Sequence, residues 1–166
     1  MRSKLKLIER FSGPKASVYS ILEETEVGIS SELMFDRFIK RYRKDFEVEL
    51  LDIARRLHSL GNKTGCLDGF FKMDEGLEVD DMVCALYDVP DKHLRLFCIR
   101  PSEQMVIIGD GGPKTTRTWQ EDAQLTKSVG DMMQVSQILR AKMNNRDTWV
   151  STSGLYLEGD LYISKT

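Results

Sequence analysis

The sequence predicts a single α+β domain spanning residues 1–166. Short runs of β-forming residues occur near both ends and in the middle of the chain, whereas two other segments carry apolar residues at helical spacing. The length suits one hydrophobic core and is short for two, and neither an internal repeat nor a low-complexity linker divides the chain. Strands and helices in separate blocks are typical of an α+β fold.

Two strands are expected at the N-terminus. The segments KLKLIERF (4–11) and ASVYSILEE (16–24) are rich in β-formers, and Gly13-Pro14 between them marks a turn. We therefore expect a β-hairpin.

A helical region begins at Ser31. Nine apolar residues follow helical spacing, namely Phe35, Phe38, Ile39, Tyr42, Phe46, Leu50, Ile53, Ala54 and Leu57. Ser30 or Ser31 is expected to cap the start of this helix, and Gly61 to close its end. A break near Asp45 would convert one long helix into a helical hairpin, and both arrangements fit the pattern.

Three strands are expected in the middle of the chain. They are MVCALYDV (82–89), LRLFCIR (94–100) and QMVIIGD (104–110), with prolines in both connections. This order predicts an antiparallel meander. In the second strand, Arg95 and Phe97 alternate with apolar neighbours, which predicts one buried face and one solvent face.

A second helix and a final strand pair are expected after the meander. Asp122 is a good N-cap, and Leu125, Val129, Met132, Leu139 and Met143 follow at helical spacing. The NNRD segment (144–147) ends this helix. The tail WVSTSGLYLEGDLYIS (149–164) predicts either a hairpin or an edge strand.

Composition excludes several classes of protein. The net charge of −2 argues against a general nucleic-acid binder, although residues 92–117 hold five cations against two acids. Because no segment reaches about 18 apolar residues and the N-terminus lacks a signal-peptide core, we expect a cytoplasmic protein that makes no membrane contact. The three cysteines and two histidines lack metal-ligand spacing, so we expect reduced structural thiols, no metal and no cofactor.

The segment IIGDGGPKTTRTWQED (107–122) holds the strongest candidate for anion binding. A nucleotide-binding P-loop is excluded because Pro113 precedes Lys114 where that motif needs glycine. One alternative is a strand exit in which Gly111 and Gly112 supply unusual backbone angles. That alternative does not explain the cations and hydroxyls that follow the glycines, which are groups that bind phosphodiester oxygens. They belong to Lys114, Thr115, Thr116 and Arg117.

Arg95 and Arg100 add two cations on the strand before this segment. One interpretation is that they converge with Lys114 on a single concave face. The other is that they are surface arginines balancing the acidic run at residues 67–91.

The segments CALYDVPDKHLRLFCIR and QMVIIGDGGPKTTRTWQED resemble the central part of RelE/HigB-type toxins of bacterial toxin–antitoxin pairs. The parallel lies in Arg95 within HLRLF, in the run MVIIGD and in PKTTR before a helix. It covers residues 84–122 in sequence and roughly 31–143 in element order. The resemblance implies a small curved antiparallel sheet with an N-terminal helical hairpin and a C-terminal helix, here with extra strands at both ends of the chain.

The resemblance also implies a function. Members of the family are ribosome-associated, metal-independent endoribonucleases that cleave messenger RNA, and a small antitoxin, here expected to be of the helix-turn-helix type, holds them inactive. Arg95, Lys114 and Arg117 would stabilise charge in the reaction, with His93 as a candidate acid or base; Arg100, Thr115 and Thr116 would bind RNA. The alternative is a non-catalytic member that binds a protein partner or regulates its operon.

Overall fold

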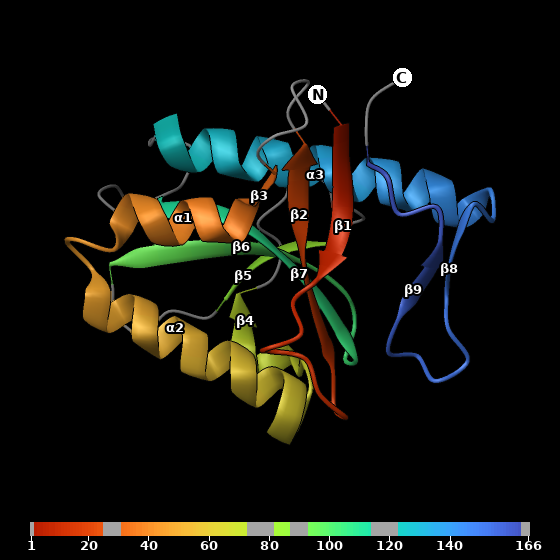
Figure 1. Cartoon of the computed structure of the whole chain (residues 1–166), viewed down its shortest axis with the longest axis horizontal. Helices are drawn as coiled ribbons and strands as arrows, with labels where there is room; N and C mark the ends of the chain where they lie inside the picture. Colours follow the sequence, from red (N-terminus) through yellow and green to blue (C-terminus); the bar gives the residue numbers. More distant parts are fainter. Residues whose placement is uncertain (1, 25–30, 73–81, 87–92, 114–122, 164–166) are drawn as a thin grey trace.

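The computed structural model describes residues 2–24, 31–72, 82–86, 93–113 and 123–163. It contains a central sheet, helices on both faces of that sheet and a small two-stranded sheet near the C-terminus (Figure 1). The α+β class is confirmed. In chain order the elements are β1 (Arg2–Leu7), β2 (Ser17–Glu24), β3 (Ser31–Leu33), α1 (Met34–Tyr42), α2 (Glu47–Ser59), a π-helical turn (Leu60–Thr64), a 3-10 turn (Asp68–Phe70), β4 (Phe71–Lys72), β5 (Val83–Leu86), β6 (Leu94–Ser102), β7 (Met105–Pro113), α3 (Ala123–Asn144), β8 (Thr148–Val150) and β9 (Leu157–Gly159).

The central sheet is mixed and mostly antiparallel. Its order is β1-β2-β7-β6-β5-β4, with β3 paired to β2 outside this path. The N-terminal hairpin and the β5-β6-β7 meander are confirmed. The expectation of a purely antiparallel sheet is wrong at one place, because β2 and β7 run parallel, with Ser17 opposite Met105. Parallel neighbours need a long crossover, and α1 and α2 lie in the connection between these two strands.

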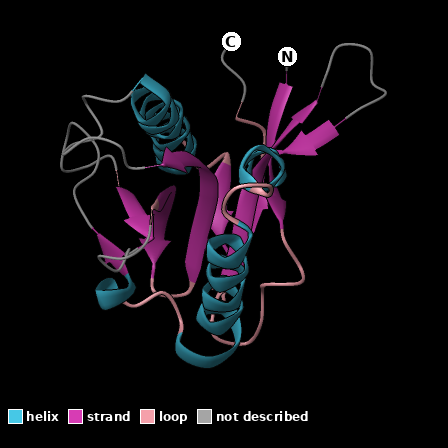
Figure 2. Cartoon of the chain, turned by 90° about the vertical axis from the view of Figure 1, so that its left-hand side faces the viewer, coloured by secondary structure: helices cyan, strands magenta, loops and turns pink. Residues whose placement is uncertain are grey.

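Helices α1 and α2 cover one face of the sheet and α3 covers the other (Figure 2). Leu94, Leu96 and Cys98 pack with α1 and α2. Phe97 and Ile99 pack with α3. The prediction that one face of β6 meets solvent is therefore wrong, because a strand pattern cannot show that a helix beginning 21 residues after the strand ends returns to cover it.

The helical hairpin is confirmed, but its predicted start signal is wrong. Ser30 lies outside the described residues, and Ser31 belongs to β3. The N-cap residue of α1 makes no side-chain cap hydrogen bond. Instead, the Phe35 N–H donates to the hydroxyl of Ser20 on β2 over 3.2 Å, and this hydroxyl donates to the Ile108 carbonyl over 2.7 Å. A strand therefore supplies the helix cap.

Gly61 does not close α2 as predicted. The helix continues into the π-helical turn, and the left-handed residue after it is Gly65, with φ of 79°. A β-carbon on Gly61 would lie 1.9 Å from the Phe11 carbonyl oxygen. Gly61 thus allows close contact between the end of α2 and the N-terminal turn.

The C-terminal predictions are confirmed where the structure describes them. Helix α3 carries the predicted apolar face in the core, and β8 and β9 form the hairpin rather than a single edge strand. The proposed N-cap Asp122 lies outside the described residues. The three cysteines are buried thiols, not disulfides. Burial raises the pKa of the Cys66 thiol to about 12, because an apolar environment disfavours the thiolate.

Replacing Tyr19 by phenylalanine should loosen the C-terminal hairpin. The Tyr19 hydroxyl on β2 accepts a hydrogen bond of 3.0 Å from the Leu157 N–H at the start of β9. Without it, this buried donor loses its partner, at a cost of about 1–3 kcal/mol. Amide hydrogen exchange should speed up in β8 and β9 while the β5-β6 ladder keeps its protection. Unchanged exchange at Leu157 would show that the hydroxyl does not hold the hairpin.

Candidate functional site

Four elements meet at one end of the central sheet, on the left in Figure 1. There β6 begins, β7 ends, α1 ends and α3 begins, and Leu94 pairs with Pro113 across the two strands. The next pair is Arg95 opposite Gly112. Most of the predicted site residues are on or directly after these strand ends.

A β-bulge in β7 shapes this end of the sheet. Leu96 pairs with Gly111 and Cys98 pairs with Ile108, so two steps along β6 correspond to three along β7. The extra residue lies at Gly109 or Asp110, and bulges of this kind re-aim the residues that follow. Because paired residues share a face, Gly112 lies on the same face as Arg95.

Gly111 and Gly112 do not supply a turn with unusual backbone angles, as the strand-exit alternative expected. Both lie within β7, and neither has a positive φ. A β-carbon on Gly111 would lie 1.8 Å from the Arg95 carbonyl oxygen. A β-carbon on Gly112 would lie 3.1 Å from both the Tyr42 hydroxyl and Cγ of Gln124. The glycines therefore permit close strand contact at Gly111, and at Gly112 they let side chains from α1 and α3 pack against the strand backbone.

Arg95 is the most unusual residue of this region. It is only 5% exposed, and its Nε atom has no hydrogen-bond partner among the described residues. Among the described residues, no Asp or Glu forms an ion pair with Arg95 either. Since Leu94 and Leu96 face α1 and α2, strand alternation turns Arg95 toward α3. A buried N–H without a partner is costly, so among the described residues the Nε of Arg95 is a donor suited to an incoming anion.

An ion pair joins Arg41 of α1 to Asp110 of β7 near this end of the sheet. Asp110 is 3% exposed, and its Oδ1 accepts hydrogen bonds of 2.8 Å from Arg41 Nη1 and from the Gly111 N–H. Burial alone would lower the pKa of Arg41, but hydrogen bonding and charge attraction to Asp110 outweigh it, and the Tyr42 hydroxyl adds to the rise. Arg41 therefore stays charged.

Tyr42 is held firmly at this end of α1. Its ring packs edge-on between Phe38 and Phe46, with centroids 5.4 and 6.0 Å away, and the Arg41 guanidinium lies 5.6 Å from its ring centre. From α3, the Gln124 amide donates to the Gly111 carbonyl over 3.3 Å. Tyr42 and Gln124 thus approach Gly112 from different helices.

The structure does not bring Arg100 to this site. Arg100 is five residues from Arg95 on the same strand, and an odd separation puts the two side chains on opposite faces. Its Nε donates to the Cys66 carbonyl over 2.6 Å, and its Nη2 lies 2.8 Å from Asp68 Oδ1. The expected convergence of Arg95 and Arg100 is wrong, and Arg100 is already engaged inside the protein.

His93 lies near the site but points to α2. Its side chain is 69% exposed, its Nδ1 is 3.6 Å from Glu49 Oε2, and its backbone N–H donates to the same carboxylate. The ring lies 6.2 Å from that of Phe46. The remaining predicted residues, Lys114, Thr115, Thr116 and Arg117, follow Pro113 directly in the sequence and lie outside the described residues.

Sequence reasoning missed Tyr42, Arg41 and Gln124. Tyr42 was assigned to the apolar face of a helix, which is correct for its ring but not for its hydroxyl. The basic run RYRK (41–44) is the one sequence signal that marks this helix end. No local pattern connects Tyr42 with Gly112, which lies 70 positions later.

The described residues include no group of three or more His, Cys, Asp or Glu side chains arranged to hold a metal ion. None of the described helices has the length and apolar character needed to cross a membrane. No protein-family model, curated protein or solved structure matches the chain.

Proposed function

We propose that this chain is the toxin of a RelE/HigB-like toxin–antitoxin pair and cleaves messenger RNA at the ribosome without a metal. The observation that carries the proposal is Arg95, a buried guanidinium whose Nε has no partner among the described residues. A phosphodiester is one of the anions with which arginine forms forked hydrogen bonds, and a desolvated guanidinium stabilises the extra negative charge of a phosphorane. This activity requires a cytoplasmic location.

Two further features support this proposal. The order helical hairpin, three antiparallel strands and helix over residues 34–144 agrees with the order that the resemblance implies. In addition, Pro113 ends β7 beside Arg95, so that Lys114 and Arg117 follow in sequence from the strand paired with β6. Arg95, Lys114 and Arg117 remain the proposed charge-stabilising residues, with Thr115 and Thr116 as RNA contacts.

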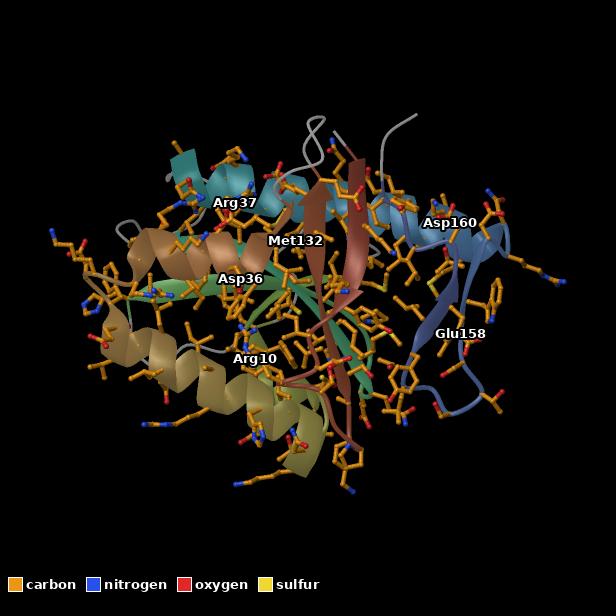
Figure 3. The ribbon with its side chains drawn as sticks, viewed as in Figure 1. Arg10, Asp36, Arg37, Met132, Glu158 and Asp160 are labelled. Carbon is orange, nitrogen blue, oxygen red and sulfur yellow. The ribbon has the colours of Figure 1, made fainter. Side chains whose placement is uncertain are left out.

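The second candidate is a non-catalytic protein-binding partner, and a groove between α1 and α2 favours it. The groove has a volume of about 880 Å³. The charged residues at its rim largely form ion pairs within the protein, namely Arg37 with Glu23, Lys40 with Glu32, and Arg10 with Asp36. Figure 3 shows Arg10 and Asp36 between the two helices. Apolar residues form its floor: Phe11, Phe35, Ile39, Leu50, Leu51 and Ala54.

Controlled expression separates the two candidates. The chain would be induced alone and together with the small gene next to it, with growth and messenger RNA integrity as readouts. A toxin arrests growth and produces transcript fragments with 5′-hydroxyl ends. Expression of the neighbouring gene, which is expected to encode a helix-turn-helix protein, should relieve this growth arrest.

A matched pair of variants tests the site itself. Arg95→Met with Lys114→Ala should abolish both growth arrest and cleavage, whereas Arg100→Met should keep cleavage wherever the protein stays folded. If the wild-type chain neither slows growth nor cleaves transcripts, the nuclease proposal is wrong and the protein-binding candidate remains.

A further inference from the structure

We propose that the outer face of α2 binds the same face of a second copy of this chain, so that two α2 helices pack antiparallel across a two-fold axis. The inference does not depend on the proposed ribonuclease activity. It is built on the exposed side chains of α2, on their spacing along the helix and on the groove beside them.

The outward side of α2 exposes apolar surface. Val48 and Leu51 are 75% and 53% exposed, which makes them the two most exposed large apolar side chains among the residues that the structure describes. Figure 1 shows α2 at the lower edge of the fold, with α1 and the sheet on its inner side. Single exposed apolar residues are ordinary on a protein surface, but two at i and i+3 on one helix form a continuous strip.

Charged residues flank this strip at equal distances from Leu51. Glu47 is four residues before Leu51 and Arg55 is four residues after it, so all three lie on one face of the helix at one-turn spacing. Both charged side chains are exposed, and neither forms an ion pair with another described residue. The face therefore carries an acid at one end, a leucine in the middle and a base at the other end.

This arrangement is complementary to itself when one helix is reversed. Because Glu47 and Arg55 are equally far from Leu51, an antiparallel pair centred on Leu51 places Glu47 of each copy opposite Arg55 of the other. A parallel pair in the same register would instead place like charges opposite each other, which is unfavourable. The two-fold arrangement forms two ion pairs around an apolar centre, and this charge complementarity makes a second copy the occupant of the face.

The groove between α1 and α2 lies along the same strip. Leu51 forms part of its wall, and so does Ala54 on the next turn of α2. In the antiparallel register, Val48 of each copy lies opposite Ala54 of the other, at the edge of the groove, where it covers apolar surface. Because the charges at the groove's rim are largely paired within the chain, the groove supplies apolar contact, and Glu47 with Arg55 supplies the orientation.

Sedimentation equilibrium of the full chain across a series of protein concentrations tests the inference. As the concentration rises, the wild-type mass should approach twice the 19.1 kDa of one chain. Glu47→Arg puts arginine opposite arginine at both ends of the helix pair and should weaken the dimer about 10-fold or more. The double variant, Glu47→Arg with Arg55→Glu, restores opposite charges and should regain the wild-type dissociation constant.

Rescue by the double variant distinguishes the interface from an effect on folding. Residues 47 and 55 are about 12 Å apart along their own helix with Leu51 between them, so a rescue reports contact between copies. Leu51→Glu, at an exposed position, should weaken the dimer about 30-fold or more and keep the circular dichroism spectrum of the folded chain. Arg146→Glu, the same charge change at an exposed arginine beyond α3, is the control and should not alter the dissociation constant.

Three results overturn the inference. They are a monomer at every concentration, a dimer that Glu47→Arg and Leu51→Glu leave intact, and a weakened dimer that the double variant does not rescue. A monomer that binds the product of the neighbouring gene, and loses it in Leu51→Glu, assigns this face of α2 to that partner and overturns the inference as well.

Discussion

Replacing Arg95 by methionine should make the protein more stable and inactive. The side chain is 5% exposed, and the Nε of its guanidinium cation has no partner in the described part of the chain, so this unsatisfied N–H costs folding free energy. A methionine fills similar space without that charge, and we expect a gain of about 1–4 kcal/mol. Cleavage should fall at least about 10²-fold, because the phosphorane loses its guanidinium.

Arg100→Met is the matched control for this prediction. Arg100 occupies the same strand, but its guanidinium donates to the Cys66 carbonyl and pairs with Asp68. Its loss should destabilise the fold by about 1.5–3 kcal/mol. Thermal unfolding in parallel with transcript cleavage gives both readouts. If Arg95→Met lowers stability as Arg100→Met does, Arg95 is a structural residue and the proposed anion site is wrong.

Substituting Gly111 by alanine should disrupt the sheet end. The added β-carbon would lie 1.8 Å from the Arg95 carbonyl oxygen, and 2.8 Å from the carbonyl carbon. Both atoms belong to the backbone of a paired strand, so no rotamer change relieves the contact. We expect a loss of about 3 kcal/mol or more, which denaturant unfolding would measure.

Gly130→Ala supplies the opposite case. Gly130 lies inside α3, and a β-carbon there would meet nothing within 4 Å. Alanine should therefore stabilise the helix by about 1 kcal/mol through its higher helix propensity. If both substitutions lower the free energy of unfolding equally, the contact between Gly111 and the Arg95 backbone is not what requires glycine at this end of the sheet.

Most individual elements could be predicted from local patterns. The 2.0 and 3.6 periods of apolar residues identify the N-terminal hairpin, the helical region that holds α1 and α2, the meander and α3, while they leave open whether that region breaks. These periods express which side of an element is buried. They do not state what buries it, and this is why the second face of β6 was misassigned.

The candidate site could be predicted only in part. Arg95 and Gly112 were singled out in two different segments of the sequence, and the structure pairs them directly. The Ser20 cap of α1, the parallel pairing of β2 with β7 and the position of the Tyr42 hydroxyl join residues far apart in the chain. No local pattern encodes such contacts, since each depends on where the crossover helices return to the sheet.

The sequence by itself determined the class of the fold, the identity of most strands and helices, and the presence of arginine and glycine where β6 and β7 meet. These properties follow from periodicity and from the geometry of single residues. The tertiary structure alone decided that Arg95 is buried under α3, that Arg100 faces the other way, and that Tyr42 reaches Gly112. The physical reason is that burial, pairing and charge compensation belong to contacts between elements, which form only when the helices close over both faces of the sheet.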